Sequence, residues 1–339
     1  MQPNKMNLIS KKDVKLPKRK KDGKKGDNGK ILVVGGSKDY IGAVALAGLA
    51  ALRSGCDWVT VAAPEKVAWA VNCLSADLVT VKLGGDYFNS KHVNEIGRLA
   101  EKHDVVLIGN GIGLRSETRQ FLKKAIKKIN NLKVIDADGI KALSSSDLEN
   151  SIMTPHIKEL EIFMANSKIS KKMIKNIINE KHIEKKALMI KKSLQGFLDE
   201  NNVILLKGHI AVIMSKNKIY YNRIGSPGMT KAGTGDVLAG LAAGFLGQSR
   251  DLLQSAVNAS YFGKLISDIL LGKKKGFTYL ASDMVREIKR VLRMLENEEI
   301  PSMEEMFRVG DNLKQKKKYS TEEVIELSHR LRGKQNKIN

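Results

Sequence analysis

The stretch that decides the fold runs Gly225-Ser226-Pro227-Gly228-Met229-Thr230-Lys231-Ala232-Gly233-Thr234-Gly235-Asp236-Val237-Leu238-Ala239-Gly240. The segment after it, residues 237–246, is apolar and rich in alanine and glycine, which is typical of a helix packed closely on its neighbours. Gly233-Thr234-Gly235 then forms the turn into that helix, whose free N–H groups and dipole favour a negatively charged ligand. Because glycine has no Cβ, a phosphate can approach the backbone there. The stretch therefore predicts a phosphate-binding turn at a helix N-terminus.

Asp236 is unusual in such a turn, because a fixed carboxylate repels a phosphate. A carboxylate at this position is useful if it acts as a general base, which takes the proton from a hydroxyl group that attacks phosphorus. The alternative is structural: Asp236 caps the helix, and the glycines form only a tight turn. The sequence favours the general base and keeps the structural interpretation open.

The chain has 339 residues, 42% of them hydrophobic, which is enough for one large α/β domain or two smaller ones. No uncharged apolar run reaches the roughly 18 residues of a membrane span, and the basic N-terminus lacks the apolar segment of a secretory signal. Cys56 and Cys73 lie in apolar-patterned surroundings without metal-ligand spacing. We therefore expect two buried free thiols in a reducing cytoplasm.

The net charge of +23 is the feature that suggests nucleic acid as a partner. The lysines, however, are scattered along the chain, and aromatic residues make up only 5%, with no stacking platform among the basic clusters. Solvated surface lysine is the preferred interpretation, so nucleic acid is not an expected partner. A nucleotide-sensing or RNA-associated protein stays as the non-enzyme alternative.

Apolar runs followed by polar clusters recur along the chain. They predict strands at residues 31–34, 58–62, 104–108, 133–138, 151–154 and 203–208, a hairpin of 211–214 with 218–221, and helices at 42–54 and 116–129. The alternation of strands and helices predicts an α/β fold with a mostly parallel central sheet and helices on both faces. The polar clusters should then meet at the carboxyl edge of the sheet, where such folds bind ligands.

Composition divides the chain into three parts. Residues 1–29 are a lysine-rich arm, expected to lie on the domain surface or on a partner subunit. Residues 30–295 form the α/β domain. Residues 296–339 are expected to be an appendage, in which Ser320-Thr321-Glu322-Glu323 predicts a capped helix.

Across residues 16–290 the chain resembles the NAD(P)H-hydrate dehydratases, a branch of the ribokinase-like superfamily. The resemblance is carried by Leu16-Pro17-Lys18-Arg19-Lys20, Gly35-Gly36-Ser37 with Tyr40-Ile41-Gly42-Ala43, Gly109 to Gly113, Asp136-Ala137-Asp138, Thr154-Pro155-His156 with Glu159, Lys207-Gly208, and Asn222 to Asp236. Gly-Thr-Gly-Asp alone occurs across ribokinase-like kinases. The Thr-Pro-His and Gly-Gly-Ser segments separate the dehydratases from those kinases.

The resemblance implies a metabolite-repair reaction: dehydration of the hydrate of NADH or NADPH back to the intact cofactor. ADP, or ATP in eukaryotic members, phosphorylates the hydrate hydroxyl, and loss of phosphate restores the ring double bond. Asp236 would take the hydroxyl proton, and Mg²⁺ would assist. The sequence leaves open which nucleotide is used, and a ribokinase-like small-molecule kinase, such as a thiamine-precursor kinase, is the alternative enzyme. The resemblance also implies a cytoplasmic homotetramer, because members of the family are commonly tetramers.

The resemblance also implies two groups of binding residues. The hydrate site maps onto Ala43, Gly113, His156 and Asp236, and the nucleotide site onto Lys207, Gly208, His209, Ile210, Ala211, Gly233, Thr234 and Gly235. No residue is assigned as a metal ligand. His156 and Lys207 also have structural alternatives, as a backbone-satisfying histidine and a surface lysine. Asp136 and Asp138 are expected behind the site, and capping of the next helix is their structural alternative.

The sequence departs from the family pattern at three places. Asn110 stands where the family usually has proline, which predicts a freer loop. The segment His156-Ile157-Lys158-Glu159 replaces His-Pro-Gly-Glu, so a different loop shape is possible. Lys231 lies in a normally neutral stretch and is expected to contact phosphate or to face solvent. The epimerase domain that many members carry is not found in the sequence, so interconversion of the hydrate epimers is not expected.

Overall fold

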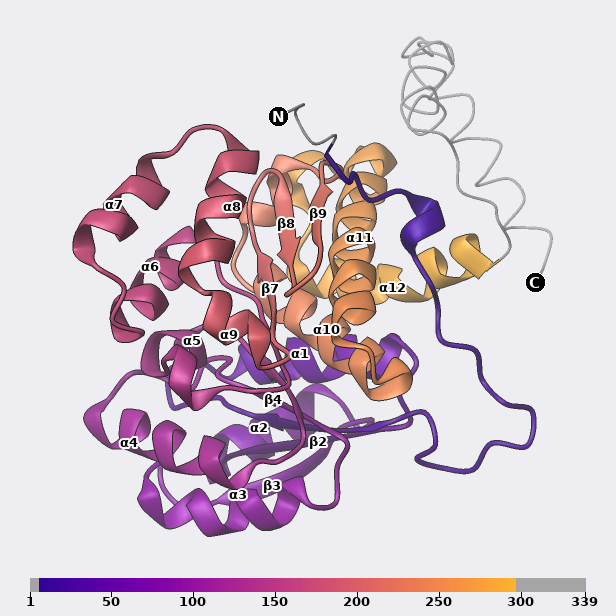
Figure 1. Cartoon of the computed structure of the whole chain (residues 1–339). Coiled ribbons are helices and arrows are strands. Elements are labelled where there is room, and N and C mark those ends of the chain that lie inside the picture. Colours follow the sequence, from indigo (N-terminus) through magenta and orange to yellow (C-terminus); the bar gives the residue numbers. More distant parts are fainter. Residues whose placement is uncertain (1–5, 297–339) are drawn as a thin grey trace, which may run out of the picture.

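A computed structural model describes residues 6–296, in which the strands form one nine-stranded sheet of order β3-β2-β1-β4-β5-β6-β7-β8-β9 (Figure 1). Neighbouring strands from β3 to β7 pair in parallel, and the β7–β8 and β8–β9 pairs are antiparallel, so β8 alone of these strands runs in the opposite direction. The strands are β1 (Lys30–Val34), β2 (Trp58–Pro64), β3 (Val79–Leu83), β4 (Val105–Ile108), β5 (Leu132–Ile135), β6 (Ser151–Met153), β7 (Val203–Leu206), β8 (Ala211–Met214) and β9 (Ile219–Asn222).

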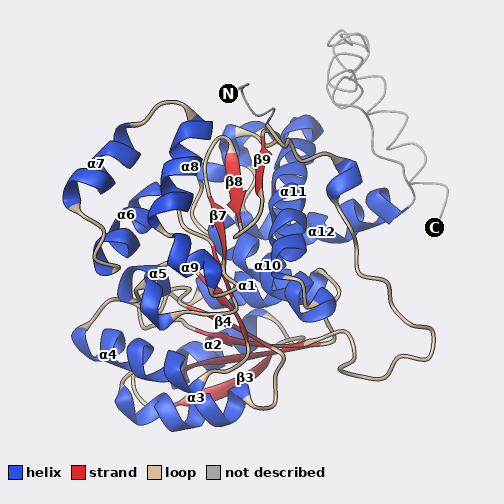
Figure 2. Ribbon diagram, viewed as in Figure 1, coloured by secondary structure: helices blue, strands red, loops and turns tan. Residues whose placement is uncertain are grey.

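Helices cover both faces of this sheet (Figure 2). One face carries α1 (Gly42–Arg53), α2 (Glu65–Leu74), α10 (Thr234–Ser249), α11 (Leu252–Leu270) and α12 (Ala281–Glu296). The other carries α3 (Val93–Ala100), α4 (Ser116–Ala125), α5 (Asp138–Ala142), α6 (Ile157–Asn166), α7 (Lys171–Asn179), α8 (Ile183–Ser193) and α9 (Gln195–Asp199). The predicted fold class is confirmed.

Strand β1 shows why the apolar runs are continuous. Ile31 and Val33 point into the core beneath α1 and α10, whereas Leu32 and Val34 point into the core on the opposite face. A strand buried on both faces has no polar alternation. Strand β3 was missed in the sequence because it is an edge strand: its Thr-Val-Lys segment is only partly buried, and Val79 is exposed.

The small residues of α10 have the packing role that the sequence predicts. A Cβ added at Gly240 would collide with the Ala47 carbonyl of α1, and one at Gly244 would collide with Ser54. The two helices therefore approach more closely than larger side chains permit. Because α10 is held against α1 in this way, its N-terminus is fixed at the carboxyl edge of the sheet, where Asp236 bonds to Asn110 after β4.

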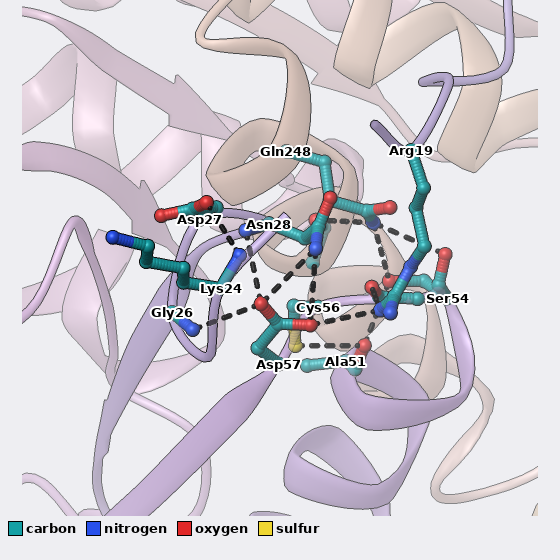
Figure 3. A network of polar contacts seen from close by, with 12 residues as sticks. Arg19, Lys24, Gly26, Asp27, Asn28, Ala51, Ser54, Cys56, Asp57 and Gln248 are labelled. Atoms are coloured by element: carbon teal, nitrogen blue, oxygen red, sulfur yellow. Dashed lines mark hydrogen bonds and ion pairs between the residues drawn. The ribbon is translucent and has the colours of Figure 1, made fainter. Parts of the chain in front are cut away.

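The described part of the basic arm, residues 6–29, lies on the surface of its own chain and passes α11 before it reaches β1 (Figure 1). Ile9 bonds to the main chain of Tyr221, and the Asn258 side chain exchanges two hydrogen bonds with the backbone of Lys15. Figure 3 shows the last attachment, where Asp57 accepts from Arg19 and from the backbone N–H groups of residues 26 and 28. The predicted appendage, apart from residue 296, lies outside the described residues.

The cysteine prediction holds for one thiol and is wrong for the other. Cys56 is buried, and burial raises the pKa of its thiol to about 12. Cys73 is exposed, because it falls on the outward side of α2, whose inward side carries Val67, Ala68 and Val71. Over residues 6–296, no helix combines the length and the apolar character that crossing a membrane needs.

Candidate active site

The loop that leads into α10 is held in shape by a glycine and by the hydroxyl group of Thr234. Gly233 has φ 88°, in the left-handed region, and a Cβ there would lie 2.8 Å from side-chain atoms of Leu46 and Ala281, so glycine is required. The Thr234 hydroxyl lies 2.7 Å from the Met229 carbonyl oxygen and 2.8 Å from that of Lys231. These contacts direct the free N–H groups of α10 toward the carboxyl edge of the sheet.

Asp236 is the third residue of α10, and the N-cap position belongs to Gly233, so the structural alternative in which Asp236 caps the helix does not hold. Its Oδ1 accepts a hydrogen bond of 2.7 Å from Asn110 Nδ2. Burial raises the pKa of the Asp236 carboxyl to about 7; the Asn110 bond and Lys207 oppose this rise, and the charge of Asp136 adds to it. A carboxyl with a pKa near neutrality suits a general base.

Asp136 follows β5 and joins residues from three strand ends. Its Oδ1 accepts from Thr154 Oγ1 at 2.7 Å and from Lys207 Nζ at 2.9 Å, and its Oδ2 accepts from Asn110 Nδ2 at 2.9 Å. It caps no helix, because the N-cap of α5 is Ala137. The polar clusters after β4, β5, β6 and β7 therefore meet at one edge, as the parallel topology predicts.

Lys207 is held inward rather than on the surface. Its side chain is 20% exposed and contacts Asp136 at 2.9 Å and Glu159 Oε2 at 3.5 Å. Burial lowers the pKa of the Lys207 ammonium, but the two carboxylates raise it by more, so the net shift is upward and the group stays charged. A fixed positive charge at this point can bind phosphate.

His156 caps a helix and also lines the cavity described below. It is the N-cap of α6: its Nδ1 accepts from the Glu159 backbone N–H, and Glu159 Oε2 accepts from the His156 N–H at 2.8 Å. This capping box forms although the segment lacks the usual Pro-Gly pair. Burial lowers the pKa of the imidazole, which favours the neutral ring at pH 7.

A cavity of about 390 Å³ lies beside this network, between the β7–β8 turn, the α10 loop and α11. Predicted site residues that line it are His156, Lys207, Gly208, His209, Ala211, Thr234 and Gly235. The other lining residues are Leu205, Gly225, Ser226, Pro227, Met229, Thr230, Leu238, Ser260 and Lys264. The predicted nucleotide residues are thus mostly brought together around one concave surface, and the positively charged Lys207 is among them.

The remaining predicted residues lie outside the lining of this cavity. Ile210 is in the β7–β8 turn and Gly233 behind the α10 turn. Ala43 lies against the loop after β4: a Cβ added at Gly111 of that loop would be 3.1 Å from the Cβ of Ala43. Gly113, at the end of that loop, donates its N–H to Asp138 at 3.0 Å. Asp236 connects the two regions, since it follows the cavity residue Gly235 and bonds to the loop through Asn110.

Comparison with known proteins decides the family. The family model for NAD(P)H-hydrate dehydratase matches residues 31–290. The chain belongs to the NAD(P)H-hydrate dehydratase family. The ADP-dependent (S)-NAD(P)H-hydrate dehydratase of Cenarchaeum symbiosum is 33% identical to it, over 77% of this chain and 88% of the relative. The bifunctional NAD(P)H-hydrate repair enzyme Nnr of Pyrobaculum aerophilum is 34% identical, over 81% of this chain. The present chain spans about half of the length of that bifunctional relative, since the match covers 52% of it.

Solved structures confirm the ribokinase-like fold of this dehydratase family member. The ADP/ATP-dependent NAD(P)H-hydrate dehydratase from Bacillus subtilis, co-crystallized with ATP/Mg²⁺, has a TM-score of 0.70 at 23% identity and covers 86% of this chain and 100% of its own. A ribokinase from Cryptococcus neoformans in complex with ADP has a TM-score of 0.52 at 14% identity, over 77% of this chain and 98% of its own.

Three residues of the site differ from what sequence reasoning predicted. Asn110 is fully buried and bonded to two carboxylates, so its loop is not freer. Lys231 is only partly exposed, and its ammonium donates to the carbonyl groups of Phe277 and Tyr279, a contact that the sequence did not indicate. Lys264 was missed: it lines the cavity and donates to the His209 carbonyl at 2.6 Å, and burial lowers its pKa to about 8. It lies in an apolar helix, where no local motif marks it.

Proposed function

We propose that this chain catalyses the ADP-dependent dehydration of the hydrate of NADH or NADPH. Membership of the family and the name of the Cenarchaeum relative support this activity. The observation that carries the proposal is the position of Asp236. This carboxyl is partly buried, has its pKa raised to about 7 by desolvation, and directly follows the glycine of a turn that borders the cavity.

In the proposed first step, the hydroxyl group of the hydrate gives its proton to Asp236, and its oxygen attacks the terminal phosphorus of the nucleotide. The new O–P bond forms as the bond from phosphorus to the nucleotide oxygen breaks, so ADP leaves as AMP. Lys207 and the N–H groups at the start of α10 counter the negative charge of the transferred group. Positioning and charge neutralisation supply most of the catalysis in such transfers.

In the second step the C–O bond of the phosphorylated hydrate breaks and inorganic phosphate leaves. The neighbouring ring carbon loses a proton, and the electron pair of that C–H bond forms the C=C bond of the intact cofactor. The hydrate is proposed to bind near Ala43, Gly113 and His156, between Asp236 and the loop after β4. The nucleotide is proposed to occupy the cavity from Lys207 to Ala211 and the turn from Gly233 to Gly235.

Magnesium is proposed to arrive with the nucleotide. Within residues 6–296, no group of three or more His, Cys, Asp or Glu side chains is arranged to hold a metal ion. Mg²⁺ in phosphoryl-transfer sites commonly takes its ligands from phosphates and water, with few protein carboxylates. The cation would lower the charge on the phosphates, and no step above depends on a metal site built by the protein. A cytoplasmic homotetramer stays a prediction from the resemblance.

The decisive assay is recovery of NADH absorbance from purified NADH hydrate with ADP, with ATP and without nucleotide. We expect recovery with ADP, and a loss of about 10²–10⁴-fold in turnover for Asp236→Asn with nucleotide binding retained. Asp77→Asn, an exposed carboxylate outside the site, is the matched control and should keep the full rate. Accumulation of a phosphorylated hydrate would favour the kinase alternative. An undiminished rate in Asp236→Asn would end the assignment of Asp236 as the base, and nucleotide binding without any NADH recovery in wild type would support the binding-protein alternative.

A further inference from the structure

Asn110 is the residue that joins the two acids of the site, Asp136, which is buried, and Asp236, which is partly buried. Its Nδ2 donates to Oδ1 of Asp236 at 2.7 Å and to Oδ2 of Asp136 at 2.9 Å. The residue is 0% exposed, and it comes directly after Gly109 in the loop that follows β4. One amide group therefore uses both of its N–H donors on carboxylates from two different parts of the chain.

The backbone on both sides holds Asn110 in this place. Gly109 has φ 122°, and a Cβ there would collide with the main-chain oxygen of Asp136, so the loop needs glycine to come so close. The Asn110 carbonyl oxygen accepts from the Gly36 N–H at 2.8 Å, and a Cβ at Gly35 would collide with the same oxygen. The side chain therefore starts from a fixed point.

The orientation of the amide is fixed by charge. If it were flipped, its carbonyl oxygen would face two carboxylates and be repelled by both. In the observed orientation, Oδ1 is buried and has no hydrogen-bond partner among the described residues. An unpaired buried acceptor destabilises a fold, and an apolar side chain of similar size would avoid this loss. The contribution of Asn110 is therefore to the two acids and not to core packing.

The second acid extends the connection to the cavity. Oδ1 of Asp136 is bonded to Lys207 and to Thr154, and Lys207 lines the cavity proposed for the nucleotide. Asp236 has its hydrogen bond from Asn110, and no ion pair to Lys207 is formed. The base is thus oriented relative to the nucleotide lysine through Asp136 and Asn110.

We propose that Asn110 is a positioning residue that fixes the carboxylate of Asp236 and couples it, through Asp136, to Lys207. The inference rests on the proposed function for the reaction it serves, but the contact itself can be tested without turnover. Asn110 touches neither the hydroxyl group nor the phosphate in this assignment, and it acts only through the base.

The expected consequence of removing Asn110 is a change in the pH at which Asp236 loses its proton. Its amide bond favours the charged form, as does Lys207 from the end of β7, whereas burial, Asp136 from the end of β5 and Glu159 from α6 favour the neutral form. Removing the amide leaves only Lys207 to oppose burial and the two acids, so Asp236 should remain protonated to higher pH. A protonated carboxyl cannot accept the hydroxyl proton.

The experiment measures turnover of NADH hydrate with ADP from pH 6 to pH 9 in wild type, Asn110→Leu and Asn110→Ser. The serine variant is included because it is small enough to fold if leucine is not tolerated. For Asn110→Leu we expect the acid limb to move up by about one pH unit, which is about a tenfold loss at pH 6 that largely recovers at pH 9. Asn110→Ser, which keeps one hydroxyl donor, should show a smaller shift.

Asn202→Leu is the matched control. Asn202 is 1% exposed and its Nδ2 also makes two hydrogen bonds, to carbonyl groups of Leu148 and Phe197, but at the opposite edge of the sheet. Its loss should lower stability and leave the pH profile unmoved. An equal loss of rate at every pH in both Asn110 variants would show a merely structural role and overturn the proposal.

A readout without turnover separates this inference from the proposed function. The melting temperature of Asn110→Ser and Asn110→Leu is compared with wild type at pH 5 and pH 8. A raised pKa of Asp236 makes the folded state lose more stability as pH rises. We expect a larger drop between the two pH values in the variants, and an unchanged drop would overturn the contact. If wild type fails to restore NADH, the proposed function fails while this comparison still decides the role of Asn110.

Discussion

Replacing Asp236 by asparagine should make the protein more stable at alkaline pH although it removes the proposed base. Burial raises the pKa of Asp236 from 3.8 to about 7 in the folded protein. In the unfolded chain the carboxyl is in water and titrates near its usual value. The folded state therefore binds the proton more tightly than the unfolded state does.

The sign of the pH effect follows from this difference. Between pH 3.8 and about pH 7 the unfolded chain has lost the proton that the folded chain still holds, so the free energy of unfolding falls as pH rises. At about 1.36 kcal/mol per pH unit, the loss reaches about 4 kcal/mol above pH 7 and is about 2 kcal/mol at pH 5. Asp236→Asn keeps the shape and an oxygen for the Asn110 amide, and it has no charge to bury.

Thermal unfolding at pH 5 and pH 8 tests this reasoning. At pH 8 the gain of up to about 4 kcal/mol corresponds to a rise of roughly 10 °C in melting temperature for a domain of this size, and the gain at pH 5 should be about half as large. Asp77→Asn, at an exposed position, should change neither value. A variant that is less stable than wild type at pH 8, or that gains equally at both pH values, would refute the burial of an ionised Asp236.

Three further outcomes are expected. The rate of hydrate dehydration should fall about tenfold per pH unit below about pH 7, because Asp236 must be ionised to accept a proton, and a flat profile from pH 5 to pH 8 would exclude it as the base. Lys207→Gln leaves Asp136 and Glu159 without their cation, so urea denaturation should show a loss of about 3–5 kcal/mol, and a loss under 1 kcal/mol would contradict the buried ion pairs. Light scattering at micromolar concentration should give four times the chain mass, and a monomer would remove the tetramer from the proposal.

Local patterns in the sequence were sufficient for the fold and for the helix start that carries Asp236. Runs such as residues 31–34 are apolar without alternation, because both faces of a parallel strand are buried, and that signal survives in the sequence alone. The glycines before Asp236 likewise mark a turn and a close helix contact, since few other residues fit there. Strand β3 escaped because an edge strand carries no such constraint.

The sequence by itself determined the order of strands and helices and the position of Asp236, since each depends on the physical properties of neighbouring residues. Only the tertiary structure decided what surrounds that acid. Asn110 meets it from 126 positions away, and Lys264 reaches His209 from 55 positions away. Neither contact leaves a periodic signal, because a hydrogen bond between distant segments constrains one side chain at each end. The pKa of Asp236 is raised first by burial and is then adjusted by Asn110, Asp136, Lys207 and Glu159, so the shift arises only once the sheet has brought its carboxyl ends together.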